Sequence, residues 1–332
     1  MAIPDYIAQL LNKDLYGAGN KEINLIQTHI SYVIITDNFV YKIKKPVQFS
    51  FLDFSTLDKR KKYCYKEVEL NKRLSPDIYL GVLEIKKFNN KFNYGKTGDT
   101  IDYCVKMKRI PEDKMMINLI KNNKITKEHI QKTASLIANF HKKAKSNQEI
   151  SKFGSLESIH KNINGNYEYA EKYIGKTLSK ETFNKIKNYS DLFLKENQDL
   201  FIKRINTGKI KDCHGDIHME HVCIDEKIYI YDCIEFNERF RYCDVISEIA
   251  FLAMDLDFHQ RSDLSKLFVN YYKEFSKDND IEKLLNFYKC YRACVRGKVD
   301  SFEIDDENLS SIEKEKAKNL AAKYFRLAES YV

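Results

Sequence analysis

The first hundred residues carry short runs of Val, Ile, Tyr and Phe that predict β-strands. The segment from Ile23 to Val47 is rich in these residues and is interrupted at Asp37-Asn38, so two or three antiparallel strands are expected there. Two longer strands are predicted at residues 79–88 and 100–107, with residues 89–98 forming the turn between them. Together these strands predict a small antiparallel sheet.

Two segments of the same region have helical spacing instead. Residues 3–18 predict a short amphipathic helix, and residues 55–74 predict a longer one. Ser55 or Thr56 is expected to cap the longer helix, because a hydroxyl at that position accepts a hydrogen bond from a free backbone N–H group.

The remainder of the chain has mostly helical spacing. One helix is predicted over residues 126–145, two more over residues 155–205, and further helices from Asp244 to the end. Strands return at residues 221–224 and 227–232, where the pattern predicts a β-hairpin.

The order of these elements predicts an α+β fold with two lobes. A small β-rich N-lobe is expected over residues 1–107, and a larger, mainly helical C-lobe over residues 108–332, with the loop and hairpin of residues 213–232 inside it. A length of 332 residues fits two lobes, and a hydrophobic share of 43% is enough for a core in each. Only 11 Gly and 4 Pro argue against a turn-dense all-β protein.

Charge and cysteine usage restrict the expected partners. The net charge of +8 comes from lysines spread along the chain, without a dense basic block, so no nucleic-acid partner is predicted. None of the eight cysteines forms a CxxC pair, which disfavours a zinc ribbon. The opening residues do not resemble an export signal, and the apolar runs fall short of the roughly 20 residues that span a bilayer. We therefore expect a cytoplasmic protein with no membrane partner.

The most informative stretch for chemistry reads CHGDIHMEHVCID over residues 213–225. Asp216 lies in a loop before the predicted hairpin, and Asp232 ends the second strand of that hairpin. Phosphoryl transfer uses one carboxylate to orient the attacking hydroxyl and another to hold the Mg²⁺ that neutralises the phosphate oxygens. The two aspartates have the residue type and the spacing that this chemistry requires.

With the β-rich lobe first and the helical lobe second, the chain resembles the protein-kinase-like fold. It looks most similar to the aminoglycoside phosphotransferase and choline kinase family, whose catalytic loop reads H-G-D-x-x-x-x-N, and within it to an uncharacterised bacterial subfamily. The resemblance covers roughly residues 20–300 and is carried by four motifs: YKIKKPV at 41–47, FLDFSTL at 51–57, CHGDIHMEH at 213–221 and YDCIEFNERFRYCDV at 231–245. It implies an ATP- and Mg²⁺-dependent phosphotransferase that acts on a small-molecule substrate.

The resemblance assigns roles to four residues of the catalytic hairpin. Asp216 is the expected catalytic carboxylate, His214 supports its loop, and Asp232 is the expected Mg²⁺ ligand. His221 stands where the wider family has a metal-binding Asn, and a ring nitrogen is a less typical Mg²⁺ ligand than oxygen. Either His221 still coordinates the metal, or Asp232 holds it with more water. The departure keeps open a second function, a nucleotide-binding pseudokinase that regulates or binds a protein partner.

A metal of a different kind is the third alternative. His214, His218 and His221 have spacing that a structural zinc site or a zinc-dependent hydrolase could use. Since two of them lie where a loop enters a strand, their convergence on one ion is not expected, and His218 is better explained as a structural residue.

A kinase-like N-lobe needs a lysine that holds the nucleotide phosphates. Lys42 is the first choice, because Val40, two residues earlier on the same strand face, could line an adenine pocket. Lys44 shares that face, and Lys44 or Lys45 would lie at the end of the strand near solvent. All three could also be ordinary surface lysines.

The lysine needs a partner glutamate on the following helix. Glu67 is preferred because it flanks the predicted buried stripe of Leu70 and Leu74, and Glu69 is the alternative.

Other nucleotide contacts are expected from the first hairpin and the end of the sheet. The loop with Thr28, His29 and Ser31 should cover the phosphates, although it has none of the glycines of a protein-kinase loop. The hinge that reads adenine should begin at Met107.

The acceptor site is the least determined part of the sequence. Glu235 lies close to the expected metal, and Arg292 and Arg296 share one helix face, where they could bind a carboxylate or phosphate or simply remain solvated. The mixed charges do not predict a polycationic antibiotic as the acceptor.

Overall fold

The computed structural model shows two compact units. Unit 1 contains residues 1–118 and 221–238, and unit 2 contains residues 119–220 and 239–332. The chain therefore leaves unit 1, enters unit 2 and returns to unit 1 for a single hairpin. The lobes predicted at residues 1–107 and 108–332 are a different division, because they leave this hairpin in the second lobe. The residues described are 3–17, 22–95, 97–307 and 309–332.

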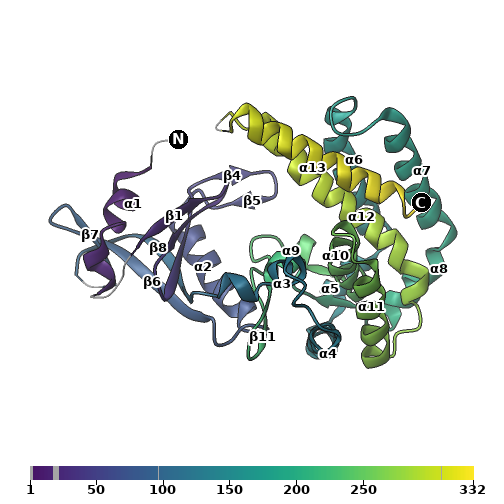
Figure 1. Cartoon of the computed structure of the whole chain (residues 1–332), viewed down its shortest axis with the longest axis horizontal. Coiled ribbons are helices and arrows are strands. Elements are labelled where there is room, and N and C mark those ends of the chain that lie inside the picture. Colours follow the sequence, from purple (N-terminus) through teal and green to yellow (C-terminus); the bar gives the residue numbers. More distant parts are fainter. Residues whose placement is uncertain (1–2, 18–21, 96, 308) are drawn as a thin grey trace. The chain divides into compact units, whose positions relative to one another are not determined.

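Unit 1 is built on a six-stranded antiparallel sheet with the strand order β1-β2-β3-β8-β6-β7 (Figure 1). Two or three strands were predicted before residue 47, and the structure has three; the two longer strands are also confirmed. The turn predicted over residues 89–98 is wrong, because residues 91–94 form a further strand that pairs with β6. Asn89 and Asn90 make the tight turn, with φ of 48° and 60°, a conformation that Asn tolerates better than most residues. The strands are β1 (Asn24–Gln27), β2 (Ser31–Ile35), β3 (Phe39–Lys44), β6 (Tyr79–Phe88), β7 (Lys91–Tyr94) and β8 (Asp99–Lys108).

A helix packs on each face of this sheet. On one face, Ile7 and Leu10 of α1 (Asp5–Leu10) join the cluster that contains Ile43 of β3. On the other face, Cys64 of α2 (Leu57–Asn71) packs with Val105 of β8. Because side chains alternate along a strand, the residues of β3 divide between these two faces. Residues 13–16, which were predicted to continue the first helix, form a short 3₁₀ turn.

Helix α2 is held in place by its cap and by a buried ion pair. The Thr56 side chain accepts a hydrogen bond from the Lys59 amide, which confirms the predicted cap. Arg60 donates from Nε to Asp102 of β8 at 2.8 Å and from its guanidinium to the Phe54 carbonyl. A two-stranded hairpin, β4 (Gln48–Phe49) and β5 (Leu52–Asp53), precedes the helix.

The returning hairpin completes unit 1. Strands β10 (Val222–Ile224) and β11 (Ile228–Ile230) pair antiparallel, as predicted. Cys223 bridges to Met115, and the Ser75 hydroxyl donates to the Ile230 carbonyl at 2.8 Å. The segment that follows β11 is thus fixed to the end of α2 and to the start of β6.

Unit 2 is mainly helical, and its centre is α10 (Val245–Phe258), which is buried on nearly all sides (Figure 1). Residues 155–205 form three helices, so the prediction of two is wrong. A short antiparallel pair, β9 (Ile210–Asp212) with β12 (Tyr242–Asp244), was not predicted. The other helices are α4 (Lys127–Lys143), α5 (Gln148–Ser151), α6 (Leu156–Ala170), α7 (Lys180–Glu196), α8 (Gln198–Asn206), α11 (Ser262–Ser276), α12 (Ile281–Phe302) and α13 (Ser311–Glu329). Two short helices, α3 (Met116–Lys121) and α9 (Glu238–Arg241), begin in unit 1 and end in unit 2.

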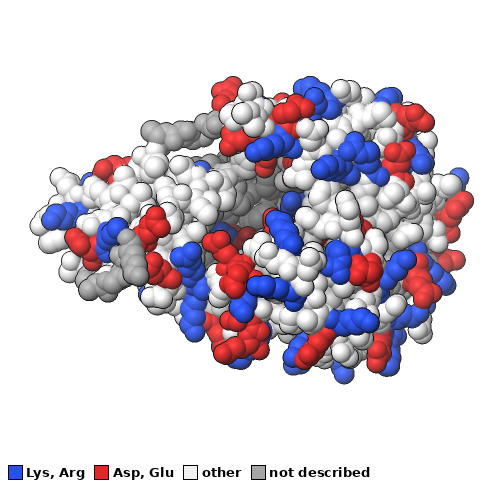
Figure 2. All heavy atoms as spheres, viewed as in Figure 1, with Lys and Arg blue, Asp and Glu red and all other residues white. Residues whose placement is uncertain are grey.

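Surface charge and hydropathy add two observations. On the face drawn in Figure 2, Lys and Arg are interspersed with Asp and Glu, so the net positive charge is not gathered into one patch there. In the part of the chain that the structure describes, no helix has the length and the apolar character needed to cross a bilayer.

The Arg60–Asp102 pair gives a first prediction. Arg60→Met should lower the free energy of unfolding by about 3 kcal/mol, because it leaves the Asp102 carboxylate buried without its cation. Lys59→Met is the matched control, since Lys59 lies on the same helix and pairs with Asp53 in an exposed position. Denaturant unfolding at pH 7 measures both variants. Equal midpoints for the two variants would show that the buried pair does not hold α2 on the sheet.

Candidate functional site

The candidate nucleotide site of unit 1 begins with two lysines on β3. Lys42 and Lys44 are two residues apart, so both side chains leave the sheet on the face that carries α2. Lys42 Nζ lies 3.0 Å from Glu67 Oε1 and 2.6 Å from Asp232 Oδ1. Burial alone would lower the pKa of Lys42, but the carboxylates of Asp232 and Glu67 raise that pKa well above its ordinary value. The ammonium group therefore stays charged.

Glu67 of α2 joins the two lysines. Its Oε2 atom accepts from Lys44 Nζ at 2.6 Å, while Oε1 faces Lys42. The carboxylate is fully buried, which by itself raises its pKa, and the two ammonium groups more than reverse this effect and lower the pKa. Glu69, the alternative partner, lies 3.5 Å from Lys66 on the exposed side of the helix.

Asp232 follows β11, and hydrogen bonds of the backbone hold it in place. It has φ of 62°, an uncommon conformation for a residue with a side chain. Its N–H donates to the Tyr79 hydroxyl at 3.2 Å, and the next N–H, of Cys233, donates to Asn71 Oδ1 at 2.9 Å. The carboxylate itself is 40% exposed. A fixed backbone with a half-exposed carboxylate suits a ligand for a hard cation.

His221 lies beside this carboxylate. Its Nε2 atom is 3.7 Å from Asp232 Oδ2, and its ring packs against Tyr231. The pair could share one cation through a nitrogen and an oxygen, so the residues fit a Mg²⁺ ion that is completed by phosphate and water. Whether the histidine or water takes the second position stays a prediction.

In the structure, the predicted phosphate loop forms a tight turn. The Thr28 hydroxyl accepts from the Ser31 amide at 2.9 Å and donates to the Ser31 carbonyl, so it is used within the turn. Ser31 is buried in β2 opposite Lys44, which puts its side chain on the same sheet face as the lysine. His29 lies in the turn. Contacts between phosphates and Thr28, His29 or Ser31 stay predictions.

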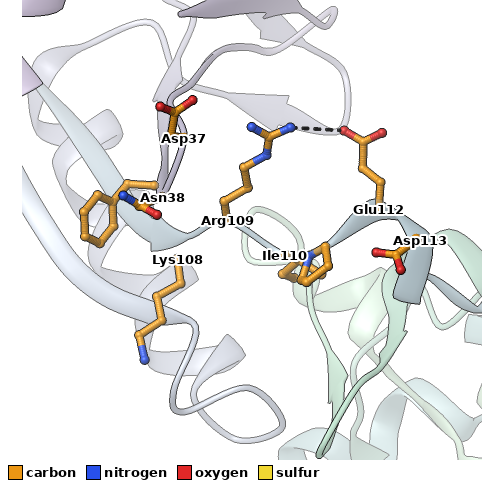
Figure 3. Close-up of a pocket in the computed structure, with 9 residues that line it drawn as sticks. Asp37, Asn38, Lys108, Arg109, Ile110, Glu112 and Asp113 are labelled. Atoms are coloured by element: carbon orange, nitrogen blue, oxygen red, sulfur yellow. Dashed lines mark ion pairs between the residues drawn. The ribbon is translucent and has the colours of Figure 1, made fainter. Parts of the chain in front are cut away.

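The expected adenine position combines Val40 and Met107. These residues pair across β3 and β8 and belong to the cluster on the α2 face of the sheet, the face of Lys42. A different hollow of about 680 Å³ lies near the end of the same strands, and Phe39, Lys108 and Arg109 are among its lining residues (Figure 3). Phe39 belongs to the opposite face of the sheet. Because its lining includes this residue of the opposite face, we do not assign the hollow to the nucleotide.

The candidate catalytic loop lies in unit 2. Glu248 of α10 accepts hydrogen bonds from the amides of His214 at 2.7 Å and Gly215 at 2.6 Å, both on Oε1. Gly215 has φ of 91°, a conformation that disfavours side chains. The Asp216 amide donates to His214 Nδ1 at 3.3 Å, so the other ring nitrogen of His214 carries the proton. This arrangement fixes the backbone that leads into Asp216. The Asp216 carboxylate is 30% exposed.

Glu248 is itself held from α4. His141 Nε2 lies 2.7 Å from Glu248 Oε2, and the Tyr272 hydroxyl lies 2.7 Å from His141 Nδ1. Burial would raise the pKa of Glu248, but His141 and the backbone donors lower it. His141, Cys213 and Glu248 lie close enough for a metal, but the hydrogen bonds already occupy both ring nitrogens and both carboxylate oxygens.

Two arginines were predicted to contact the acceptor, and their contacts in the structure differ. Arg292 is buried and donates to the carbonyls of Ser247 and Gly215, so its contacts support the loop. Arg296 lies 3.9 Å from Asp300, whose pKa burial raises to about 6. The acceptor contacts predicted for Arg292 and Arg296 stay untested, and the contacts within unit 2 account for Arg292.

The remaining histidine of the loop has a local partner. His218 Nε2 lies 3.6 Å from Asp216 Oδ2, and its ring packs on Phe251. Burial would lower the pKa of His218, and the Asp216 carboxylate more than offsets this and raises it. Within the described ranges, no possible metal-binding group contains His214, His218 and His221 together.

Sequence reasoning missed several residues of this arrangement. The sequence also gave no sign that Glu235 is buried against Lys44, and its predicted contact with the acceptor stays a prediction. The contacts of Tyr79, Asn71 and His141 were not predicted, because a single polar residue within an apolar pattern gives no sign of its partner. A signal existed only for Lys44, which shares the strand face of Lys42.

Comparison with known structures defines the fold. The chain superposes on the GDP complex of aminoglycoside 2'-phosphotransferase-IIIa with a TM-score of 0.54 and 11% identity, over 97% of this chain and 99% of the other. A choline/ethanolamine kinase family protein from Mesorhizobium loti gives 0.52 and 10% identity, over 97% of both chains. Choline kinase LicA from Streptococcus pneumoniae gives 0.50 and 14% identity, over 97% and 99%. The chain has the bilobal protein-kinase-like fold of these phosphotransferases.

Sequence comparison gives relatives without a described activity. Proteins of Mycobacterium tuberculosis and Mycobacterium bovis, both described only as uncharacterised, are 30% identical over 279 residues. That match covers 84% of this chain and 54% of each relative, so the chain spans about half their length. No family model matches the chain.

The Glu248 network gives a second prediction. Because its pKa is lowered in the folded chain, ionised Glu248 stabilises the fold above its unfolded pKa of about 4.3, and this stabilisation is lost as the pH falls through the lower folded pKa. Glu248→Gln should therefore be less stable than wild type at pH 7, and the difference should shrink towards pH 3. Denaturant unfolding across this range measures it. A difference that did not change with pH would contradict the assigned charge.

Proposed function

We propose that this chain is an ATP- and Mg²⁺-dependent phosphotransferase that acts on a hydroxyl group of a small metabolite. The observation that carries the proposal is the contact of Lys42 with both Glu67 and Asp232 in unit 1. A lysine held by a helix glutamate, next to a half-exposed aspartate, is the arrangement that holds nucleotide phosphates and their metal in kinases. The shared fold with aminoglycoside and choline phosphotransferases supports it.

Each residue has a defined task in this proposal. Lys42 would bind the nucleotide phosphates, and Asp232, with or without His221, would hold Mg²⁺, which supplies positive charge to the phosphate oxygens. Asp216 would accept a hydrogen bond from the acceptor hydroxyl, orient it and take up its proton as the oxygen attacks. Glu248 fixes the loop backbone, so that the Asp216 carboxylate does not have to be ordered during the reaction.

The acceptor is proposed only as a class. The similar structures are phosphotransferases of aminoglycosides, choline and ethanolamine, according to their names, which makes a small hydroxylated molecule the natural expectation. One of them holds GDP, so the phosphate donor should be tested with guanine as well as adenine nucleotides.

A specific observation keeps the pseudokinase as a second candidate. The turn after β1 uses the Thr28 hydroxyl for its own backbone, and the second metal position has a histidine. Such a chain could bind a nucleotide and act through a protein partner instead of transferring phosphate.

The third prediction separates these two functions. Asp216→Asn keeps size and shape but removes the charge that orients and deprotonates the acceptor, so turnover should fall by about a hundredfold or more while nucleotide affinity is unchanged. Asp232→Asn should instead weaken Mg²⁺-nucleotide binding, because a hard cation loses a charged ligand. Asp225→Asn, in the exposed turn of the same hairpin, is the matched control.

Nucleotide binding is measured by the shift in melting temperature with ATP or GTP and Mg²⁺. Turnover is measured as slow nucleotide hydrolysis and as phosphate transfer to a panel of hydroxylated metabolites. Equal residual activity in wild type and Asp216→Asn, with binding intact in both, would favour the pseudokinase. If millimolar nucleotide gave no shift in the wild type, a kinase-like site would be ruled out.

A further inference from the structure

The second lysine of β3 lies in a position that the proposed chemistry does not require. Lys44 is 1% exposed, and its Nζ atom contacts carboxylates from two separate segments, Glu67 of α2 and Glu235 after β11. The ammonium also lies 4.7 Å from the centre of the Phe54 ring, a favourable cation–π position. Burial would lower the pKa of Lys44, and Glu235 and Glu67 reverse this and raise it. Lys44 is therefore a buried, charged link between α2 and the segment that carries Asp232.

We propose that Lys44 and Glu235 form a positioning pair that fixes Glu67 and the Asp232 segment independently of Lys42. The inference rests on the proposed function, because the residues it positions are those assigned to phosphate and metal. Neither member of the pair is proposed to contact the nucleotide or the acceptor.

The division of the Glu67 carboxylate is the first argument. Each of its oxygens faces a different lysine, with Lys44 on Oε2 and Lys42 on Oε1. In a simple lysine–glutamate pair, movement of the lysine towards a phosphate would leave the buried glutamate without its cation. Here Lys44 stays with Glu67, so Lys42 can move towards phosphate at a smaller desolvation cost.

The segment from Asp232 to Asn237 supplies the second argument. Asp232 pairs with Lys42, and Arg73 donates to Cys233 Sγ. The neutral contacts of the segment include the Cys233 N–H donating to Asn71, Phe236 packing on Phe54 and Phe51, and the Asn237 side chain donating to the Phe51 carbonyl at 3.0 Å. Glu235 adds a charged contact three residues after Asp232. An ion pair in a buried position is directional and strong only while both partners remain in place, so it specifies the path of this segment.

The burial of Glu235 argues against the acceptor role that its sequence position suggested. The side chain is 5% exposed, and Lys44 occupies its Oε1 atom. A carboxylate in this position helps to position other residues of unit 1.

The fourth prediction compares three variants with a control. Lys44→Met leaves two buried carboxylates short of a cation and should reduce stability. Lys44→Met/Glu235→Met removes both charges of the pair and should recover most of that stability, since apolar residues often replace buried ion pairs without loss. Glu235→Gln keeps the shape of the side chain. Lys86→Met is the matched control, a strand lysine whose glutamate partner, Glu84, is exposed.

The decisive readout is hydrogen exchange of the peptide that covers residues 231–237, which needs no nucleotide. In the double variant we expect exchange there to be faster by about tenfold, with a melting temperature near wild type and unchanged exchange in β8. Glu235→Gln should show a smaller increase, and Lys86→Met none. Recovered stability together with wild-type exchange would overturn the proposal. If the double variant does not fold, unchanged exchange in Glu235→Gln would overturn it.

A second readout tests the link to the metal. The Mg²⁺ concentration that half-saturates the nucleotide-dependent melting shift should rise by about fivefold or more in the double variant, while nucleotide binding in EDTA should change little. If the wild type shows no nucleotide shift, the proposed function fails, and the exchange measurement still decides whether Lys44 and Glu235 position the segment. An unchanged Mg²⁺ requirement with faster exchange would overturn the link to the metal.

Discussion

The ammonium groups of Lys42 and Lys44 can lie inside unit 1 only because carboxylates from two other parts of the chain reach them. A buried charge without a partner costs several kcal/mol, so strand β3, helix α2 and the segment after β11 have to be brought together. This requirement explains why the hairpin of residues 222–230 returns to unit 1 after a hundred residues in unit 2. A further buried pair, Arg60 with Asp102, also holds α2 to the sheet.

Unit 2 also contains a buried carboxylate, Glu248, which backbone N–H donors stabilise. Glu248 neutralises no lysine; it accepts two backbone N–H groups and faces His141, so its charge is compensated by hydrogen bonds. In both units the supporting carboxylates are buried, while Asp216 and Asp232, the two proposed to act, are 30% and 40% exposed. The structure therefore separates residues that fix geometry from residues that remain accessible to a ligand.

The sequence predicted the periodic parts of this structure well and the pairings poorly. The strands of β3, β6 and β8 and the cap at Thr56 follow from local residue preferences, which act over a few positions. The candidate catalytic loop and Lys42 were predicted from motifs, and their roles stay predictions. The partners of Glu235 and His141, which are Lys44 and Glu248, were not predicted, because they lie 191 and 107 residues away along the chain. No local pattern encodes such a distance.

The cost of the charged cluster bears on whether unit 1 binds a phosphate group. Replacing a buried ion pair by apolar side chains is often neutral or stabilising, so two lysines and three carboxylates are an expensive way to fill this part of unit 1. A module that only presented a surface to a protein partner would gain nothing from this expense. A site that must release Lys42 to a phosphate while keeping Glu67 and Asp232 in place does gain from it, because Lys44 carries the compensating charge. The second lysine thus supports the proposed phosphate site, which the enzyme and the nucleotide-binding pseudokinase would share.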